Sequence, residues 1–282
     1  MITFSDIVKR VQSLPPLLDI TLKIQALYKK GAEHVDVRKL IKLIESDATL
    51  TANVLKFVNA PKYGFSKKIS SVAQAVTLLG TEVIYGLVLD YAIHEKLKAN
   101  ISTYGITNIQ FNDICHLQSA LLLQWYSLID TRDAQFLAPL ALIMELGKLV
   151  IAKEISQSSY ATRFRRGLAG YEDVVEYEYD LLGTTSYFVT GLLFEQWNLD
   201  LIFVEILETL DFTDEQELSP RVEYYRGILD VVRSTVNVKG ILTDNSIANG
   251  SKIVREIGLS EDTFLRVARR LKRSYEESKG LA

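Results

Sequence analysis

The side chains best suited to acid–base or nucleophilic chemistry are three histidines and one cysteine. They are His34, His94, His116 and the single cysteine, Cys115. Histidine can transfer protons or bind a metal near neutral pH, and a cysteine thiolate is a nucleophile. Adjacent helix residues point about 100° apart, so Cys115 and His116 are not expected to form a catalytic pair. We interpret Cys115 as buried and structural, and His34 and His94 as isolated surface residues.

Sequence motifs of four common functional classes are missing. The chain contains no G-x-x-x-x-G-K-[S/T], no G-x-G-x-x-G, no C-x-x-C and no H-E-x-x-H. These patterns mark phosphate loops, dinucleotide sites, zinc ribbons and zinc proteases, respectively. None of these four functions is therefore expected.

A turn with two aromatic residues is the second candidate for function. The sequence N-A-P-K-Y-G-F occupies residues 59–65, and two lysines follow it closely. A glycine in such a turn can adopt a positive φ, and loops with aromatic residues often bind partners. A purely structural turn is the alternative interpretation. The predicted partner-binding residues are Asn59, Tyr63, Gly64, Phe65, Lys67 and Lys68.

Composition and charge are ordinary for a globular protein. The chain has 282 residues, of which 48% are hydrophobic and 24% are charged, with a net charge of −3. This charge gives no overall attraction to nucleic acid or to an anionic membrane, so neither is an expected partner. Basic clusters lie at residues 163–166 and 266–273. We interpret them as solvated helix faces, with local binding of nucleic acid or membrane as the alternative.

The sequence predicts a cytoplasmic protein. Its first residues carry Asp and Lys inside an apolar pattern, which is not typical of a signal peptide. No uninterrupted apolar run approaches the ~18 residues of a transmembrane helix. A single cysteine excludes an intramolecular disulfide.

Apolar residues recur at helical spacing through nearly the whole chain, and no segment of convincing length has the period of a strand. This pattern predicts an all-α protein. Asp47 is expected to cap one helix. Ser71 and Gln74 form an S-x-x-Q capping box for the next helix, which Gly80 is expected to end.

A loop-like segment, A-N-I-S-T-Y-G-I-T-N at residues 99–108, is the clearest break in the pattern. We predict an N-terminal helical half at residues 1–98 and a second helical half at residues 109–212. Residues 213–282 are expected to form a helical extension packed on the second half, beginning with an acidic linker.

Four short motifs follow one another in the N-terminal half. They are L-P-P-L from Leu14, E-S-D-A-T-L-T followed by N-V-L-K-F-V-N-A from Glu45, Y-G at Tyr63, and S-V-A-Q-A-V-T-L-L-G from Ser71. In this order and spacing they resemble the HDOD domain, a relative of the HD metal-dependent phosphohydrolases. The resemblance continues more weakly to about Leu210. It implies a multi-helix bundle in which an N-terminal helical subdomain packs on an HD-like helical subdomain.

The resemblance also locates the positions of the HD metal ligands. Enzymes of that class use His and Asp to hold ions that polarise phosphate and generate hydroxide. The first His of the family matches His116. The His-Asp pair falls on Met144 and Glu145, and the later Asp-His pair falls on Thr185 and Ser186. Methionine is too soft a ligand for such ions, and threonine and serine replace imidazole poorly.

The later part of the family pattern is retained only in part. A Gly and a Trp match Gly191 and Trp197, whereas a final His-His pair falls near Thr209 and Leu210. His116 and Glu145 are then the remaining candidate ligands. We interpret His116 as a hydrogen-bonded core residue, with a residual ligand role as the alternative. The resemblance therefore implies a scaffold without catalytic residues, metal or cofactor.

HDOD domains are regarded as signalling modules in bacteria, so the resemblance implies a non-catalytic bacterial signal-transduction protein that binds a protein partner. One alternative is a nucleotide or second-messenger binding protein that uses a degenerate pocket near His116 and Glu145. Another is a residual metal-dependent phosphohydrolase. A polar pocket at His116 would favour ligand binding, and a filled apolar core there would favour the partner-binding scaffold. The oligomeric state is left open.

Overall fold

The computed structural model describes residues 2–199, 201–211 and 219–280, and its contacts divide the chain into two units. Unit 1 comprises Met1–Pro15, Leu97–Cys115 and Met144–Asp262, and unit 2 comprises Pro16–Lys96, His116–Ile143 and Thr263–Ala282. This grouping differs from the predicted consecutive segments 1–98, 109–212 and 213–282, because the units interleave. The predicted acidic linker lies mostly outside the described residues.

Among the described residues, all regular secondary structure except one small hairpin is helical, which confirms the predicted all-α class. Their one sheet is an antiparallel hairpin of two two-residue strands, β1 (Val236–Asn237) and β2 (Gly240–Ile241). The Asn237 side chain closes the turn by accepting a hydrogen bond from the Gly240 backbone N–H at 3.0 Å.

Unit 2 contains most of the N-terminal helices and two later segments. Its elements are α2 (Asp19–Tyr28), η1 (Ala32–His34), α3 (Val37–Glu45), α4 (Ala48–Val58), η2 (Pro61–Tyr63), α5 (Val72–Leu79), α6 (Thr81–Lys96), the part of α7 (Asn108–Tyr126) from His116, α8 (Thr131–Ile143) and the part of α16 (Glu261–Lys279) from Thr263.

Helix α6 is the core helix of unit 2. It is apolar nearly all round, and it packs against α2, α4, α5 and α8. Gly86 makes the approach to α8 close, because a Cβ at this position would lie 2.7 Å from the Cβ of Pro139. A larger residue at Gly86 would therefore push the two helices apart.

The helix caps before α4 and α5 follow the sequence with one difference. Asp47 accepts a hydrogen bond from Leu50 N at 2.9 Å, and Ser71 accepts one from Gln74 N at 3.2 Å, which confirms both caps. In a capping box, the Gln74 side chain would accept a hydrogen bond from the backbone N–H of the cap residue, Ser71. Here Gln74 Oε1 instead accepts from Ser70 N, at 2.9 Å. The residue before the cap is thus the one that Gln74 ties down.

Replacing Ser71 with alanine is expected to lower the free energy of unfolding by about 0.5–2 kcal/mol, since a first-turn N–H loses its acceptor. Urea denaturation of the full chain measures this change. Ser66→Ala is the matched control, because Ser66 is exposed and caps no helix, and a change below about 0.5 kcal/mol is expected. An unchanged midpoint for Ser71→Ala would show that the cap contributes nothing.

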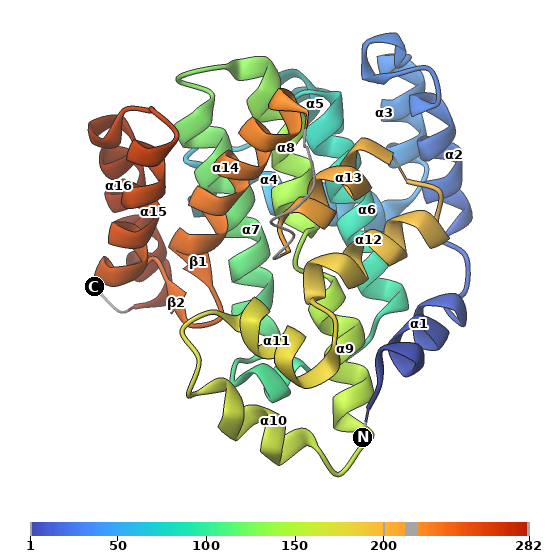
Figure 1. Ribbon diagram of the computed structural model, residues 1–282. Coiled ribbons are helices and arrows are strands. Elements are labelled where there is room, and N and C mark those ends of the chain that lie inside the picture. Colours follow the sequence, from blue (N-terminus) through green and yellow to red (C-terminus); the bar gives the residue numbers. More distant parts are fainter. Residues whose placement is uncertain (1, 200, 212–218, 281–282) are drawn as a thin grey trace. The chain divides into compact units, whose positions relative to one another are not determined.

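Unit 1 is built from the remaining helices and the hairpin (Figure 1). Helices α14 and α15 pack side by side around the hairpin, and α12 packs against α1, α9 and α13. Its elements are α1 (Phe4–Gln12), η3 (Ile101–Tyr104), the part of α7 up to Cys115, α9 (Gly147–Ser156), α10 (Ala161–Leu168), α11 (Val174–Leu182), α12 (Ser186–Gln196), α13 (Leu201–Thr209), α14 (Pro220–Thr235), β1, β2, α15 (Asp244–Glu256) and the start of α16.

One apolar stretch, residues 131–156, is long and apolar enough to cross a membrane, with a mean hydropathy of 1.6. However, 89% of its most apolar window is buried inside the protein. A core segment has the same property, so this stretch is weak evidence for a membrane span. The cytoplasmic location stays a prediction.

Candidate functional site

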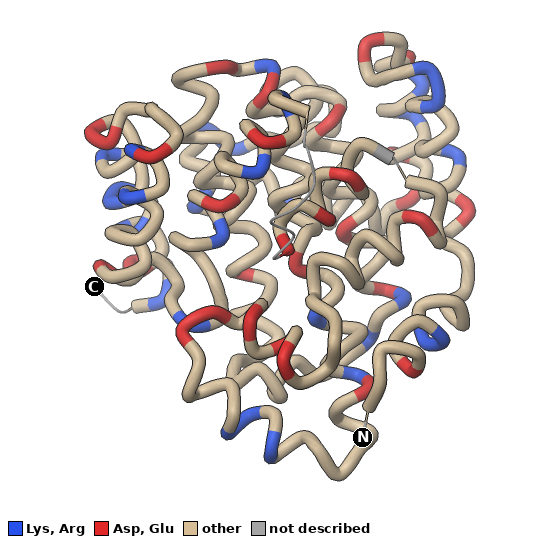
Figure 2. The backbone as a smooth tube through the Cα atoms, viewed as in Figure 1, with Lys and Arg blue, Asp and Glu red and all other residues tan. Residues whose placement is uncertain are grey.

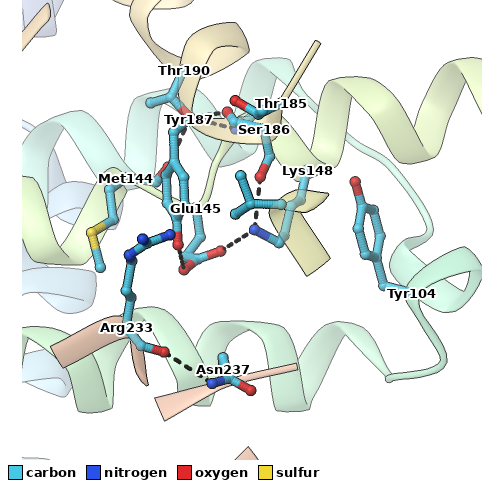
Figure 3. Close-up of polar contacts among 12 residues, drawn as sticks. Tyr104, Met144, Glu145, Lys148, Thr185, Ser186, Tyr187, Thr190, Arg233 and Asn237 are labelled. Atoms are coloured by element: carbon cyan, nitrogen blue, oxygen red, sulfur yellow. Dashed lines mark hydrogen bonds and ion pairs between the residues drawn. The ribbon is translucent and has the colours of Figure 1, made fainter. Parts of the chain in front are cut away.

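In unit 1, two of the positions carried over from the HD ligand pairs, Glu145 and Ser186, lie in a buried cluster of charged and hydroxyl side chains (Figure 3). At its centre is Lys148, whose side chain is 3% exposed. We call this group the Lys148 cluster. Its members are Tyr104, Glu145, Lys148, Glu178, Ser186 and Tyr187.

The Lys148 ammonium is held between two helices. Its Nζ lies 2.5 Å from Glu145 Oε2 and donates a hydrogen bond to Ser186 Oγ at 2.8 Å. The other carboxylate oxygen of Glu145 accepts a hydrogen bond from the Tyr187 hydroxyl at 3.0 Å. The ammonium also lies 4.9 Å from the centre of the Tyr187 ring, within range of a cation–π interaction. The charge of the ammonium is thus paired inside the protein.

Glu178 is the second buried carboxylate of the cluster. It accepts hydrogen bonds from the Tyr104 hydroxyl at 2.7 Å and from Ser186 N at 2.6 Å. Burial raises the pKa of Glu178, and the nearby Lys148 charge and the two donors only partly oppose this effect. Burial alone would lower the pKa of Lys148, but Glu145 and Glu178 raise it above its usual value. Lys148 therefore stays protonated.

The local fold places these side chains by bringing α9 against the start of α12. A Cβ on Gly147 would lie only 2.0 Å from Ser186 O, so only glycine permits this approach. The Thr190 hydroxyl joins the same helices: it accepts from Gly147 N at 2.9 Å and lies 2.8 Å from Met144 O. Lys148, next to Gly147 on α9, thereby reaches Ser186.

Two of the carried-over positions support the cluster from its edge. Met144 is fully buried, and its backbone carbonyl accepts the hydrogen bond from Thr190. Thr185 caps α12 by accepting from Phe188 N at 3.2 Å, and its hydroxyl contacts Asp211. Burial raises the pKa of Asp211 to about 6, although the Thr185 hydrogen bond opposes this. Both residues thus have structural roles.

His116 belongs to unit 2, on α7, whereas Glu145 belongs to unit 1, so the predicted pocket shared by the two stays a prediction. The His116 side chain is 23% exposed, and its ring packs edge-on against Phe57 with 4.5 Å between centroids. Its Nε2 lies 3.9 Å from Asp90 Oδ2. Burial lowers the pKa of His116, and Asp90 opposes this effect. Most of the ring is therefore buried in unit 2.

His94 is not an isolated surface residue, and that prediction is wrong. Its Nδ1 lies 2.9 Å from Asp90 O and 3.2 Å from Asp90 Oδ1, one helical turn earlier on α6. Burial would raise the pKa of the Asp90 carboxyl, but His94 and His116 lower it below its usual range. The i,i+4 spacing of Asp90 and His94 was the signal in the sequence. His34 is exposed and Cys115 is buried, as predicted.

Tyr63, one of the predicted partner-binding residues, is buried, so its ring is not exposed for a surface contact. The residue is 6% exposed, and its ring packs on Phe57 with 4.5 Å between centroids. Asn59 is structural as well, because its side chain accepts from Ile69 N and donates to Ile69 O and Leu55 O, all within 2.7–2.8 Å. These three hydrogen bonds close the turn at its base.

The other predicted partner-binding residues lie at the surface. Gly64 adopts the expected positive φ of 70° and is exposed. Phe65 is partly exposed, and Lys67 and Lys68 are exposed. Their role in partner binding stays a prediction.

Comparison with known protein families assigns the chain to a family. The model of the HDOD domain matches residues 14–211. The chain belongs to the HDOD family. No curated protein matches it.

Three solved structures share the HDOD fold with this chain. A candidate phosphohydrolase from Shewanella amazonensis SB2B has 17% identity and a TM-score of 0.68, with 98% of each chain covered. A candidate signal transduction protein from Marinobacter aquaeolei VT8 has 20% identity and a TM-score of 0.66, covering 96% of this chain and 60% of that one. An HDOD domain protein of unknown function from Geobacter sulfurreducens has 17% identity and a TM-score of 0.62, covering 96% and 95%.

The HD-type metal ion does not fit the side chains of this HDOD protein. Among the described residues, no group of three or more His, Cys, Asp or Glu could hold a metal. At the carried-over position of Glu145, the carboxylate is already neutralised by the Lys148 ammonium. A metal cation there would have to displace a buried, protonated lysine.

A small polar cavity adjoins the Lys148 cluster. Its volume is about 230 Å³, below the roughly 300–1,000 Å³ of most ligand pockets. Arg233 and Tyr187 both line the cavity, and the Arg233 guanidinium lies 5.3 Å from the centre of the Tyr187 ring. Arg233 also forms an ion pair with Asp230. Lining residues include Glu145, Lys148, Glu172, Asp173, Tyr187, Arg233, Asn237 and Asn249.

Proposed function

We propose that this HDOD protein is a non-catalytic regulatory protein of the bacterial cytoplasm that acts by binding a protein partner. The observation that carries the proposal is the bonding of the Lys148 ammonium to Glu145 and Ser186, at positions carried over from the HD ligand pairs. A phosphohydrolase needs open coordination sites and an activated water there. In this chain, the same positions hold an internally paired structural network.

A regulatory role is supported by the family, because the fold is kept while these ligand positions are not. The Marinobacter protein that shares the fold is described as a candidate signal transduction protein. A domain that has lost its ligands retains its outer helical surface, and that surface can still bind other proteins.

Purified protein is expected to contain no stoichiometric metal, because Met144, Thr185 and Ser186 are unsuitable ligands for a phosphate-handling ion. Elemental analysis of protein purified without chelator tests this. The control is a chelator-treated sample from the same preparation. One equivalent of Fe, Mn or Zn per chain, lost on chelation, would contradict the prediction.

The function itself is tested by capture and by reconstitution. The tagged chain is used to capture proteins from its native host, and each candidate partner is then purified and titrated against the full chain by calorimetry. Hydrolysis of bis(4-nitrophenyl) phosphate with added Mn²⁺ is measured in parallel. The proposal fails if no purified partner binds, or if hydrolysis occurs and is abolished by Glu145→Gln but not by Glu172→Gln.

A second candidate function, binding of a small polar ligand, is favoured by the cavity beside the Lys148 cluster. Its wall carries two paired cations, Lys148 and Arg233, and the carboxylates of Glu145, Glu172 and Asp173, so it offers both donors and acceptors to a small polar ligand. Its volume is too small for a dinucleotide second messenger without rearrangement. Calorimetric titration with nucleoside monophosphates tests this function, and the absence of any heat of binding would exclude it for that class.

A further inference from the structure

The turn at residues 59–65 and the basic C-terminal helix α16 meet on one face of unit 2. The two features are more than 200 residues apart in the chain, yet Ser274 Oγ of α16 lies 3.5 Å from Pro61 O. Gln124 of α7 bridges them: its amide donates to Lys62 O at 2.5 Å and accepts from the Arg270 guanidinium at 2.9 Å. Features that the sequence presents separately therefore form one surface.

Between Phe264 and Arg273, every exposed residue of α16 is an arginine. At 100° per residue, the buried positions form one stripe and the arginines fall on the opposite side. Figure 2 shows basic positions gathered along this helix. We call the opposite side the arginine face. Its buried stripe is Phe264, Val267, Ala268 and Leu271, and the face comprises Arg266, Arg269, Arg270 and Arg273, all exposed.

The positive charge of this surface is not neutralised within the described part of the chain. Arg266, Arg269 and Arg273 form no ion pair with a described residue. Glu276 lies 3.8 Å from Lys272. Glu277 is exposed one turn beyond Arg273 on the same side of the helix, but it forms no ion pair with a described residue, so the face keeps an excess of positive charge.

Residues that closely follow Pro61 and Lys62 in the chain add further positive charge and an apolar side chain near these contacts. Lys67 and Lys68 are exposed, and Phe65 is partly exposed. Aromatic and arginine side chains are the types that dominate binding hot spots. The surface thus offers several unpaired cations beside one aromatic ring.

The size of the surface and the charge of the whole chain favour a short occupant. The arginine face covers about two helical turns, or roughly 11 Å at 1.5 Å per residue. The chain as a whole carries −3, so the remainder of its surface must be net negative. A long polyanion such as nucleic acid would extend onto that negative surface, whereas a short acidic segment would not.

We propose that the arginine face and the adjoining turn bind a short acidic segment of a partner protein. This inference rests on the proposed function, since it names the chemistry of the partner. Guanidinium groups bind carboxylates through paired, charge-assisted hydrogen bonds, so four arginines over two turns match carboxylates at helical spacing. Phe65 provides a contact for an apolar residue of the same segment.

The test uses the full chain and a defined probe, a fluorescein-labelled hexaglutamate peptide followed by anisotropy. Saturable binding is expected at low salt, weakening toward an ionic strength of about 0.15 M. The double variant R269E/R273E is expected to bind about tenfold more weakly or worse. The matched control R38E/K39E makes the same charge change at exposed positions of α3 and is expected to bind like the unmodified chain. Circular dichroism confirms that both variants are folded.

Three results would overturn the inference: no saturable peptide binding, equal binding by R269E/R273E, or tighter binding of single-stranded hexathymidylate than of hexaglutamate. Its failure is distinguishable from that of the proposed function. If a purified partner binds R269E/R273E as tightly as the unmodified chain, the arginine face is not the binding site, but the regulatory role still stands. If no partner binds at all, the proposed regulatory role itself is wrong.

Discussion

Replacing Lys148 with methionine is expected to lower the free energy of unfolding by about 3–5 kcal/mol. Methionine fills a similar volume, so the loss comes from charge rather than from a cavity. Without the ammonium, the buried Glu145 and Glu178 carboxylates lose the lysine charge that stabilises both of them in the cluster. Uncompensated buried charge is among the most costly defects in a folded protein.

The loss is expected to depend on pH. Burial raises the pKa of Glu178 in the folded state, and Lys148 opposes that rise. A raised folded pKa means that protonation favours the fold. The resulting stability is present below the unfolded pKa of about 4.3 and is lost as pH rises through the folded pKa. Lys148→Met raises the folded pKa further, so its deficit is expected to be larger near pH 8 than near pH 5.

Guanidinium denaturation of Lys148→Met at the two pH values measures both effects. Lys153→Met is the control, because Lys153 is a half-buried lysine on the same helix that forms no ion pair with a described residue and does not belong to the cluster. It is expected to cost less than about 1 kcal/mol. A loss this small for Lys148→Met near pH 8 would show that the carboxylates do not depend on the lysine.

Features set by nearby residues could be predicted from the sequence. The Asp47 and Ser71 caps require only a side chain and an amide three residues later, and the structure contains both. The basic cluster at residues 266–273 lies on a helix, α16 (Glu261–Lys279), as its interpretation as a helix face requires. Gly64 adopts the positive φ that its turn predicts.

Features set by tertiary contacts could not be predicted. Tyr63 has polar and charged neighbours in the chain, but its ring is buried by Phe57, which lies on the preceding helix. Glu145 and Lys148 are three residues apart, so their pairing is visible in the sequence. Their partner Ser186 is 38 residues beyond Lys148 and is brought close only by the packing of α9 on α12.

Replacing Gly147 with alanine is expected to lower the free energy of unfolding by about 3 kcal/mol or more. The added Cβ would lie 2.0 Å from Ser186 O and 2.9 Å from Thr190 N. Both are backbone atoms of α12, so no side-chain rotation relieves the clash, and α9 and α12 must separate. Separation would also lengthen the hydrogen bond from Lys148 to Ser186 and weaken the cluster.

Gly191→Ala is the matched control because Gly191 is also a buried helical glycine in unit 1. Its added Cβ would meet only Val204 Cγ1, at 3.7 Å, an ordinary van der Waals contact. Alanine in a helix interior is favoured over glycine by up to about 1 kcal/mol, so this variant is expected to be neutral or slightly stabilised. Thermal and urea unfolding of the two variants compare them directly. If Gly147→Ala were as stable as Gly191→Ala, the approach of α9 to α12 would not require glycine, and the geometry of the Lys148 cluster would have to be different.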